Sequence, residues 1–165
     1  MTAESTGPLS RPLAVADIPP DGLDVTVEAS PEEREALARA FKVPAVHALV
    51  GVFHVSGTRS RVHVSGRVDA RIEQICVVSL DPFENEVHEE VEVDFAAASD
   101  APPEGEDPPD AIVGGTVDLG ALTAEFLALG LDPHPRKPGV DFSFEAAEDP
   151  TASPFAALDK LKRDG

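Results

Sequence analysis

The feature that most constrains the fold is a long alternation of apolar and polar side chains that begins after Arg61. Every even position from Val62 to Leu80 is apolar or small except Gln74. Successive side chains of a β-strand point to opposite faces of the sheet, so this pattern predicts a long strand with one buried face. A turn is expected at Asp81-Pro82-Phe83, because proline presets a turn conformation. The segment from Glu84 to Phe95 then alternates in the complementary register, which predicts a long antiparallel hairpin.

Shorter patterns before the hairpin predict further strands and a helix. An edge strand is expected over Leu13 to Ile18, and a second strand over Leu23 to Ala29. Ser30-Pro31-Glu32-Glu33 is typical of a helix start, because serine caps the helix, proline takes the first position and Glu33 completes a capping box. Val46 to Ser56 is apolar on both sides, which predicts a central strand.

The part of the chain after the hairpin is less regular. Residues 96–110 are rich in proline and acidic side chains and have no large apolar residue, which predicts a disordered insertion. Asp118 is expected to cap a second helix, and Ser153-Pro154 to begin a third one. Val140 to Phe144 indicates a short strand between these two helices.

Together these patterns predict an α+β fold: a twisted antiparallel sheet or partial barrel built on the long hairpin, with about three packed helices. The predicted organisation is a flexible N-terminus, residues 1–10, followed by a single domain, residues 11–163, that contains the acidic insertion at 96–110. The chain has no apolar stretch of membrane-spanning length and no secretion signal, so we expect a cytoplasmic protein.

The charge balance narrows the possible partners. The chain has 13 basic and 31 acidic residues, and its net charge is −18. Phosphate backbones repel such a chain unless its few cations gather on one face, and the absence of Trp and Tyr removes the usual platforms for base stacking. The composition therefore disfavours a general nucleic-acid binder and permits a basic protein partner.

The residues suited to catalysis or metal binding form no recognisable site. Cys76 is the only cysteine and shares the core-facing register, without a basic residue within three positions to lower its pKa, so we interpret it as structural. The five histidines lack zinc-site spacing, and no metal or cofactor is expected. The alternative is a small cytoplasmic hydrolase or transferase that uses Cys76 or a histidine.

Two surfaces are candidate binding sites. The first is basic and has two open interpretations: a track for RNA or an acidic partner, or a row of cations neutralised by carboxylates on the return strand. If Ser79 pairs with Glu84, then Arg71 lies opposite Glu92, and we favour neutralisation for Arg71. The second surface is the acidic outward row of the return strand, which suits a basic protein. The basic candidates are Arg59, Arg61, His63, Arg67, Arg136 and Lys137, and the acidic ones are Glu84, Glu86, Glu90, Glu92 and Asp94.

Four stretches, in this order, resemble the bacterial YceD family, whose members are described as large ribosomal RNA subunit accumulation proteins. Members of that family commonly carry Cys-x-Arg-Cys-Leu at the hairpin turn. Cys76 matches the first cysteine and Leu80 the leucine, whereas Val78 and Ser79 replace the arginine and the second cysteine. The stretches are Arg11-Pro12, the turn from Cys76 to Pro82 with its acidic return strand, Val117 to Pro135, and Pro154-Phe155 through Lys162.

The resemblance implies a cytoplasmic accessory factor, without established catalytic activity, for the accumulation of 23S ribosomal RNA. It also implies a structural role for Cys76, Leu80 and Pro82 in the turn and for Pro154 and Phe155 near the C-terminus. On this basis we expect a non-enzymatic assembly factor whose partner is a large-subunit ribosomal protein, an assembly intermediate, or the RNA.

Overall fold

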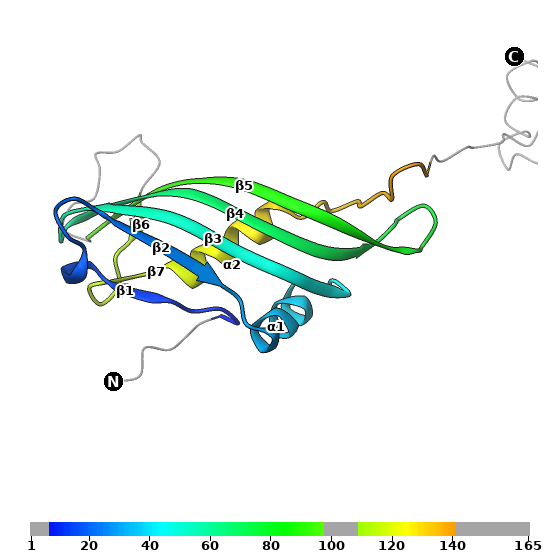
Figure 1. Ribbon diagram of the computed structural model, residues 1–165, viewed down its shortest axis with the longest axis horizontal. Coiled ribbons are helices and arrows are strands. Elements are labelled where there is room, and N and C mark those ends of the chain that lie inside the picture. Colours follow the sequence, from blue (N-terminus) through cyan, green and yellow to red (C-terminus); the bar gives the residue numbers. More distant parts are fainter. Residues whose placement is uncertain (1–6, 98–108, 141–165) are drawn as a thin grey trace, which may run out of the picture.

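A computed structural model describes residues 7–97 and 109–140 (Figure 1). The α+β class and a mostly antiparallel sheet are confirmed. The main sheet has five strands in the order β2-β3-β4-β5-β6, and a separate two-stranded sheet joins β1 to β7. The elements are β1 (Pro12–Ala14), a 3-10 helix (Val15–Asp17), β2 (Leu23–Glu28), α1 (Pro31–Phe41), β3 (Ala45–Gly57), β4 (Arg61–Ile75), β5 (Pro82–Ala96), β6 (Asp110–Ala111), β7 (Thr116–Asp118) and α2 (Leu119–Gly130).

The two longest strands are β4 and β5, and they pair antiparallel along their whole length. Their register differs from the predicted one: Arg71 lies opposite Glu86 and not opposite Glu92, a shift of six positions along β5. The reason is the position of the turn, which takes Cys76 to Asp81 and is centred three residues earlier than the predicted one, so that Pro82 and Phe83, expected in the turn, belong to β5. A shift by an even number leaves each side chain on its predicted face, because the side-chain period of a strand is two.

One face of the main sheet forms the core. The buried side chains include Phe53 on β3, Val64 and Ile72 on β4, and Val91 on β5. Helix α2 crosses this inner face: Gly51 is so close to α2 that a Cβ there would lie 2.7 Å from the Thr123 hydroxyl. The two-stranded sheet and α1 complete the cover (Figure 1). The outward residues of β2 to β5 form the opposite, or outer, face.

Gln74 is the single polar residue among the inward-facing positions of β4, and its contacts explain why it is tolerated there. It is 4% exposed, yet its side chain is fully engaged. Its amide oxygen accepts a hydrogen bond from Asn85 Nδ2 at 3.0 Å, and its amide nitrogen donates to the Asp132 carbonyl at 3.3 Å. A buried amide is tolerated when both of its ends find partners. Gln74 therefore ties the hairpin to the segment that follows α2.

The described residues contain two α-helices. Ser30 caps α1 in the predicted capping box, with the Glu33 amide donating to its hydroxyl and the Ser30 amide donating to the Glu33 carboxylate. Asp118 caps α2, as predicted. The third predicted helix, with Pro154 and Phe155, lies outside the described residues, as does most of the strand predicted over Val140 to Phe144.

The N-terminal segment packs differently from the prediction. The edge strand expected to reach Ile18 ends at Ala14, where the 3-10 helix begins, and it pairs with β7 and not with the main sheet. Leu9, within the stretch predicted to be flexible, is 1% exposed, and the Ser10 hydroxyl donates a hydrogen bond to Asp118 at 2.7 Å. The central part of the acidic insertion, residues 98–108, lies outside the described residues.

Candidate functional site

The outward side chains of β5 form the most negatively charged row on the outer face. Alternation places the even positions of β5 on this face, and all of them from Glu84 to Asp94 are exposed. We call the outward carboxylates of this strand the β5 acidic row: Glu84, Glu86, Glu90, Glu92 and Asp94. The structure thus brings together all five residues predicted for an acidic face.

Both ends of the β5 acidic row are paired with side chains of β4. Arg71 Nε lies 2.7 Å from Glu84 Oε1, and His63 Nδ1 lies 2.8 Å from Asp94 Oδ1. Neutralisation of Arg71 was the favoured interpretation of the sequence, but its partner is Glu84 because of the register shift. Both pairs are solvent-exposed, so each contributes at most about 1 kcal/mol to stability. Arg71 cancels the charge of Glu84, whereas the His63 ring satisfies Asp94 by a hydrogen bond.

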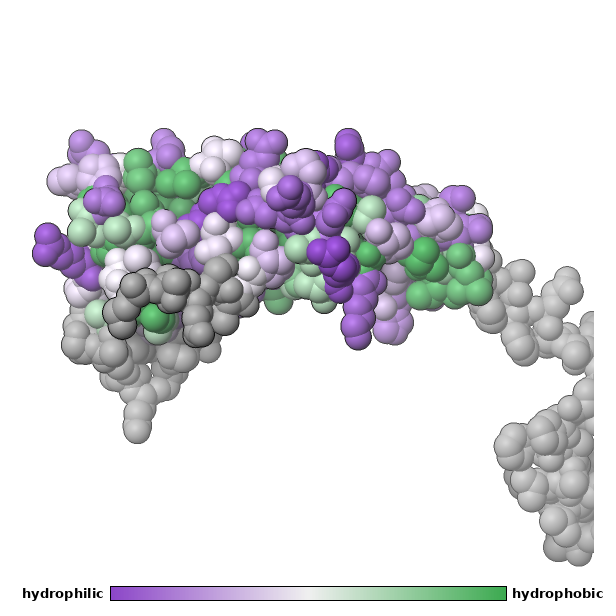
Figure 2. Space-filling model, turned by 90° about the horizontal axis from the view of Figure 1, so that it is seen from below, coloured by the Kyte–Doolittle hydropathy of each residue, from purple (hydrophilic) through white to green (hydrophobic). Residues whose placement is uncertain are grey.

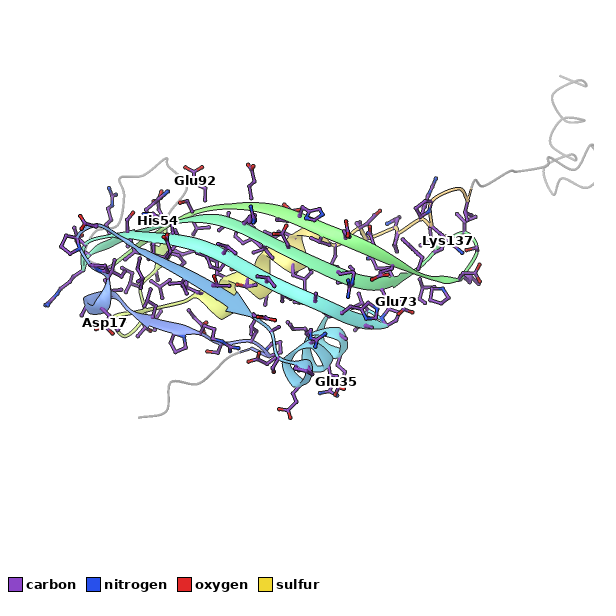
Figure 3. The ribbon with its side chains drawn as sticks, viewed as in Figure 1. Asp17, Glu35, His54, Glu73, Glu92 and Lys137 are labelled. Atoms are coloured by element: carbon purple, nitrogen blue, oxygen red, sulfur yellow. The ribbon has the colours of Figure 1, made fainter. Side chains whose placement is uncertain are left out.

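The centre of the row keeps its negative charge. Arg67 lies opposite Glu90, but its Nε pairs with Asp69 on the same strand, at 3.1 Å from Oδ2. Glu92 lies opposite Ser65 and projects away from the sheet (Figure 3). Among the described residues, neither Glu90 nor Glu92 takes part in an ion pair. These two carboxylates are the part of the row available to a cationic partner.

The histidines of the sheet are also paired with carboxylates. His54 Nδ1 lies 2.7 Å from Asp24, and His88 Nδ1 lies 2.7 Å from Asp69. The hydrogen bond to Asp69, followed by the contact with Glu86, raises the pKa of His88 because both stabilise the protonated ring. Histidines spread in this way serve as partners for nearby acids. Within the described ranges, no group of three or more candidate ligands could hold a metal ion.

Cys76 lies in the turn of the hairpin and has no exposed surface. Hydrogen bonds to the thiolate lower its pKa to about 6, first from the Ser79 side chain, then from the backbone of Ser79 and of Lys137. The Ser79 amide is 3.5 Å from Sγ. The sequence argument considered only basic residues within three positions of Cys76, and it missed these donors, because they are the Ser79 hydroxyl and backbone groups, and Lys137 is remote in sequence.

The buried position of Cys76 predicts low reactivity despite its low pKa. The thiol has no exposed surface, so a reagent cannot reach it without opening of the turn. We expect an aromatic disulfide reagent to react with the native protein at least about 100-fold more slowly than with the urea-unfolded chain. Equal rates in the two states would show an accessible thiolate and would favour the hydrolase or transferase alternative.

The tip of the hairpin exposes apolar side chains beside two cations. Leu80 is 73% exposed and takes a left-handed backbone conformation, φ +60°, which is rare for leucine. The Val77 amide donates to the Pro135 carbonyl at 2.9 Å, which fixes the segment after α2 against the tip. The exposed Arg136 and Lys137 belong to this segment (Figure 3). Figure 2 shows a hydrophobic patch at this end of the molecule.

The predicted basic residues do not form one surface. Arg59 and Arg61 lie at the β3–β4 turn, whereas Arg136 and Lys137 lie at the opposite end of β4. A strand of 15 residues is about 45 Å long, so these pairs of cations are far apart. His63 and Arg67, which lie between them, are already paired with Asp94 and Asp69. Among the described residues, only the two ends offer basic side chains without ion pairs on this track.

Comparison with known protein families matches more than half of the chain. Residues 64–162 match the family described as "Large ribosomal RNA subunit accumulation protein YceD". The match begins within β4 and includes the hairpin turn, the β5 acidic row and α2. The chain belongs to the YceD family.

Further comparisons add no relatives. The search of curated proteins finds no match to this YceD chain. The search of solved structures finds none either. In the part of the YceD chain that the structure describes, no helix combines the length and apolar character needed to cross a membrane.

Proposed function

We propose that this YceD protein is a non-enzymatic factor that supports accumulation of large-subunit ribosomal RNA by binding a basic ribosomal protein on the β5 acidic row. The family description connects the chain with large ribosomal RNA. The observation that carries the proposal is the pair of exposed carboxylates, Glu90 and Glu92, with which no cation of the described residues forms an ion pair. A lysine-rich segment would supply the missing charges and would be shielded from premature contact with RNA.

The sequence around this site strengthens the electrostatic argument. Residues 84–110 contain eleven acidic side chains and no Lys or Arg. A surface with one sign of charge attracts oppositely charged proteins over several ångströms and speeds their encounter. The same surface repels RNA phosphates. In this proposal, direct contact with RNA is therefore left to the cations at the ends of β4, Arg59 with Arg61 and Arg136 with Lys137.

The environment of Cys76 supports a non-enzymatic role over the alternative of a hydrolase or transferase. A nucleophilic thiolate must be accessible and near a general base. Cys76 is fully buried, and the hydrogen bonds that the described residues make to it come from its own turn and from Lys137. The histidines of β3, β4 and β5 face carboxylates on the outer sheet surface.

Salt dependence tests the proposed surface. Binding of a lysine-rich large-subunit ribosomal protein should weaken steeply as the Debye length falls from about 10 Å at 0.1 M salt to about 3 Å at 1 M. We expect the double variant Glu90→Gln and Glu92→Gln to bind about tenfold more weakly at 0.1 M salt, with a shallower dependence on salt. Fluorescence anisotropy of the labelled ribosomal protein would measure both quantities.

A matched control separates the β5 acidic row from net charge. Glu35→Gln with Glu125→Gln removes the same two charges from exposed positions on α1 and α2, away from the outer face. This variant should bind nearly as tightly as the unchanged protein and keep its salt dependence. If both double variants lose affinity equally, the row acts only through the overall charge of the protein, and the proposed binding surface is wrong.

A further inference from the structure

The β5 acidic row lies along a free edge of the main sheet. Strand β5 pairs with β4 over its whole length, but β6 covers only Phe95 and Ala96. From Pro82 to Asp94, β5 has a neighbouring strand on one side only among the described residues. This edge is about 40 Å long at the usual rise of a strand. A sheet edge of that length can pair with another chain.

The hydrogen-bond pattern shows which backbone groups face the free edge. The Ala97 amide donates to Ser60 and the Cys76 amide to Asp81, each at 2.9 Å, and both pairs continue the β4–β5 register. Directly bonded pairs alternate in an antiparallel ladder, so the odd residues of β5 bond to β4. The even residues then turn their N–H and C=O groups away. The Ile112 amide donates to the carbonyl of Ala96, an even residue, at 3.0 Å, which agrees with this assignment.

The residues that expose these backbone groups are those of the β5 acidic row and His88. The Glu86 amide is bonded to the Asn85 side chain at 3.0 Å, so it is not available. The amides of His88, Glu90 and Glu92 have no such partner in the described part of the chain. The unpaired donors therefore include the amides of Glu90 and Glu92, the two carboxylates without an ion pair among the described residues. One incoming strand could provide carbonyl acceptors for these amides and basic side chains for these carboxylates.

A strand added at this edge would have two different faces. Its residues directly opposite Glu90 and Glu92 would project onto the outer face, beside those carboxylates, where basic side chains are favoured. The intervening residues would project onto the inner face, beside Val87, Val91 and Val93 and, between the first two, Glu89. Helix α2 reaches β5 on that side, since Gly130 contacts Val87, and the adjacent Leu129 is 72% exposed. Apolar side chains suit the positions beside the three valines.

We propose that the free edge of β5 binds an extended segment of the partner by strand addition, and that this segment has basic residues at every second position and apolar residues between them. This inference rests on the proposed function, since it specifies how the basic protein is held. Backbone hydrogen bonds would supply affinity, and the alternating side chains would supply specificity. The row also repels the same edge of a second copy, which disfavours self-association.

Short peptides test the proposal. The probe is a labelled peptide, Lys-Val-Lys-Val-Lys-Val-Lys, compared with two versions of the same charge. In one, the lysine amides are N-methylated, and in the other, the valine amides. Methylation removes a donor and blocks pairing on one edge of the peptide only. Strand addition predicts that one methylated peptide binds like the parent and the other at least about tenfold more weakly. Weaker binding of the peptide with methylated lysine amides would indicate an antiparallel strand, because a lysine opposite Glu90 or Glu92 then bonds directly to it. Weaker binding of the peptide with methylated valine amides would indicate a parallel strand, because the bonds then go to the residues on either side of each lysine.

The outcomes separate this inference from the proposed function. If all three peptides bind equally and Glu90→Gln with Glu92→Gln weakens all of them, the acidic row binds cations without strand addition, and only the inference fails. If the parent peptide does not bind, strand addition is wrong, while binding of the intact ribosomal protein still decides the proposed function. If the ribosomal protein also fails to bind, both proposals fail.

A protein variant supplies an independent measurement. Glu92→Pro and Glu92→Gln remove the same charge, but only proline removes an edge-facing amide, and its ring obstructs an incoming strand. The ladder to β4 is unaffected, because even residues do not bond to it. We expect Glu92→Pro to bind the parent peptide about tenfold more weakly than Glu92→Gln. Equal affinities of folded variants, checked by circular dichroism, would overturn the proposal, and the peptide comparison remains decisive if the proline variant unfolds.

Discussion

Replacement of Gly66 by alanine is expected to destabilise the fold by about 3 kcal/mol or more, as measured by urea unfolding. Gly66 lies in the middle of β4, opposite Phe53 of β3. A Cβ atom there would lie 2.0 Å from the Val52 carbonyl oxygen and 2.9 Å from the Phe53 Cα. Both atoms belong to the backbone of the central strand, so they cannot move aside as a flexible side chain would. The main sheet would have to separate locally.

A second glycine provides the control for this prediction. Gly114 has a left-handed conformation, φ +62°, and no atom lies within 4 Å of the position that a Cβ would take. Gly114→Ala should therefore cost only the conformational penalty of about 1–2 kcal/mol. If Gly66→Ala were no more destabilising than Gly114→Ala, β3 and β4 would be less closely packed at Gly66 than the structure indicates.

Loss of the Asp118 carboxylate is expected to cost about 2–3 kcal/mol. Its Oδ1 accepts bonds from the amides of Gly120 and Ala121, at 3.0 Å each, and from the Arg11 amide at 2.7 Å. Its Oδ2 accepts from the Ser10 hydroxyl. One side chain thus caps α2 and fixes the N-terminal segment. Thermal unfolding of Asp118→Ala would measure the loss, and Ser10→Ala, which removes a single bond, should cost no more than about 1 kcal/mol.

The carboxylates near α1 and α2 also predict sensitivity to acid. Burial raises the pKa of Asp118, but the bonds from Arg11, Ser10 and the helix amides outweigh it and lower the pKa overall. The hydrogen bond from Arg11 lowers the pKa of Glu33 from 4.5 to about 2. A lowered pKa contributes stability that is present above the ordinary value and is lost as the pH falls through the folded value. Stability should therefore decrease from about pH 4.5 towards pH 2, and less steeply in Asp118→Ala.

Local signals in the sequence predicted the elements that depend on neighbouring residues. The capping box of Ser30 and Glu33 and the cap at Asp118 are satisfied within three residues, so they can be identified without the fold. The long alternation of β4 and β5 also reflects a local period. The register between these strands could not be predicted in the same way, because it depends on the position of the turn, where Cys76 is buried and Val77 bonds to Pro135, which is remote in sequence.

Contacts between distant segments account for the other differences. The pairing of β1 with β7 joins residues more than 100 positions apart, and neither short strand has a strong pattern of its own. The acidic residues of the candidate site were predictable from alternation, since all five share one face. The division of this row into paired ends and an unpaired centre was not predictable, because it depends on Arg67 forming its ion pair with Asp69 and not with Glu90.

The late position of α2 in the chain has a consequence for synthesis on the ribosome. Strands β2 to β5 are complete at Ala96, but α2 ends only at Gly130. At typical elongation rates of 5–20 residues per second, the helix emerges roughly 2–7 s later. During this interval the apolar side of the nascent sheet lacks its main cover, and β1 lacks its partner β7. During this time the newly made chain is most exposed to aggregation and to chaperones. A ribosome stalled between Ala96 and Gly130 would present a sheet whose apolar face is only partly covered.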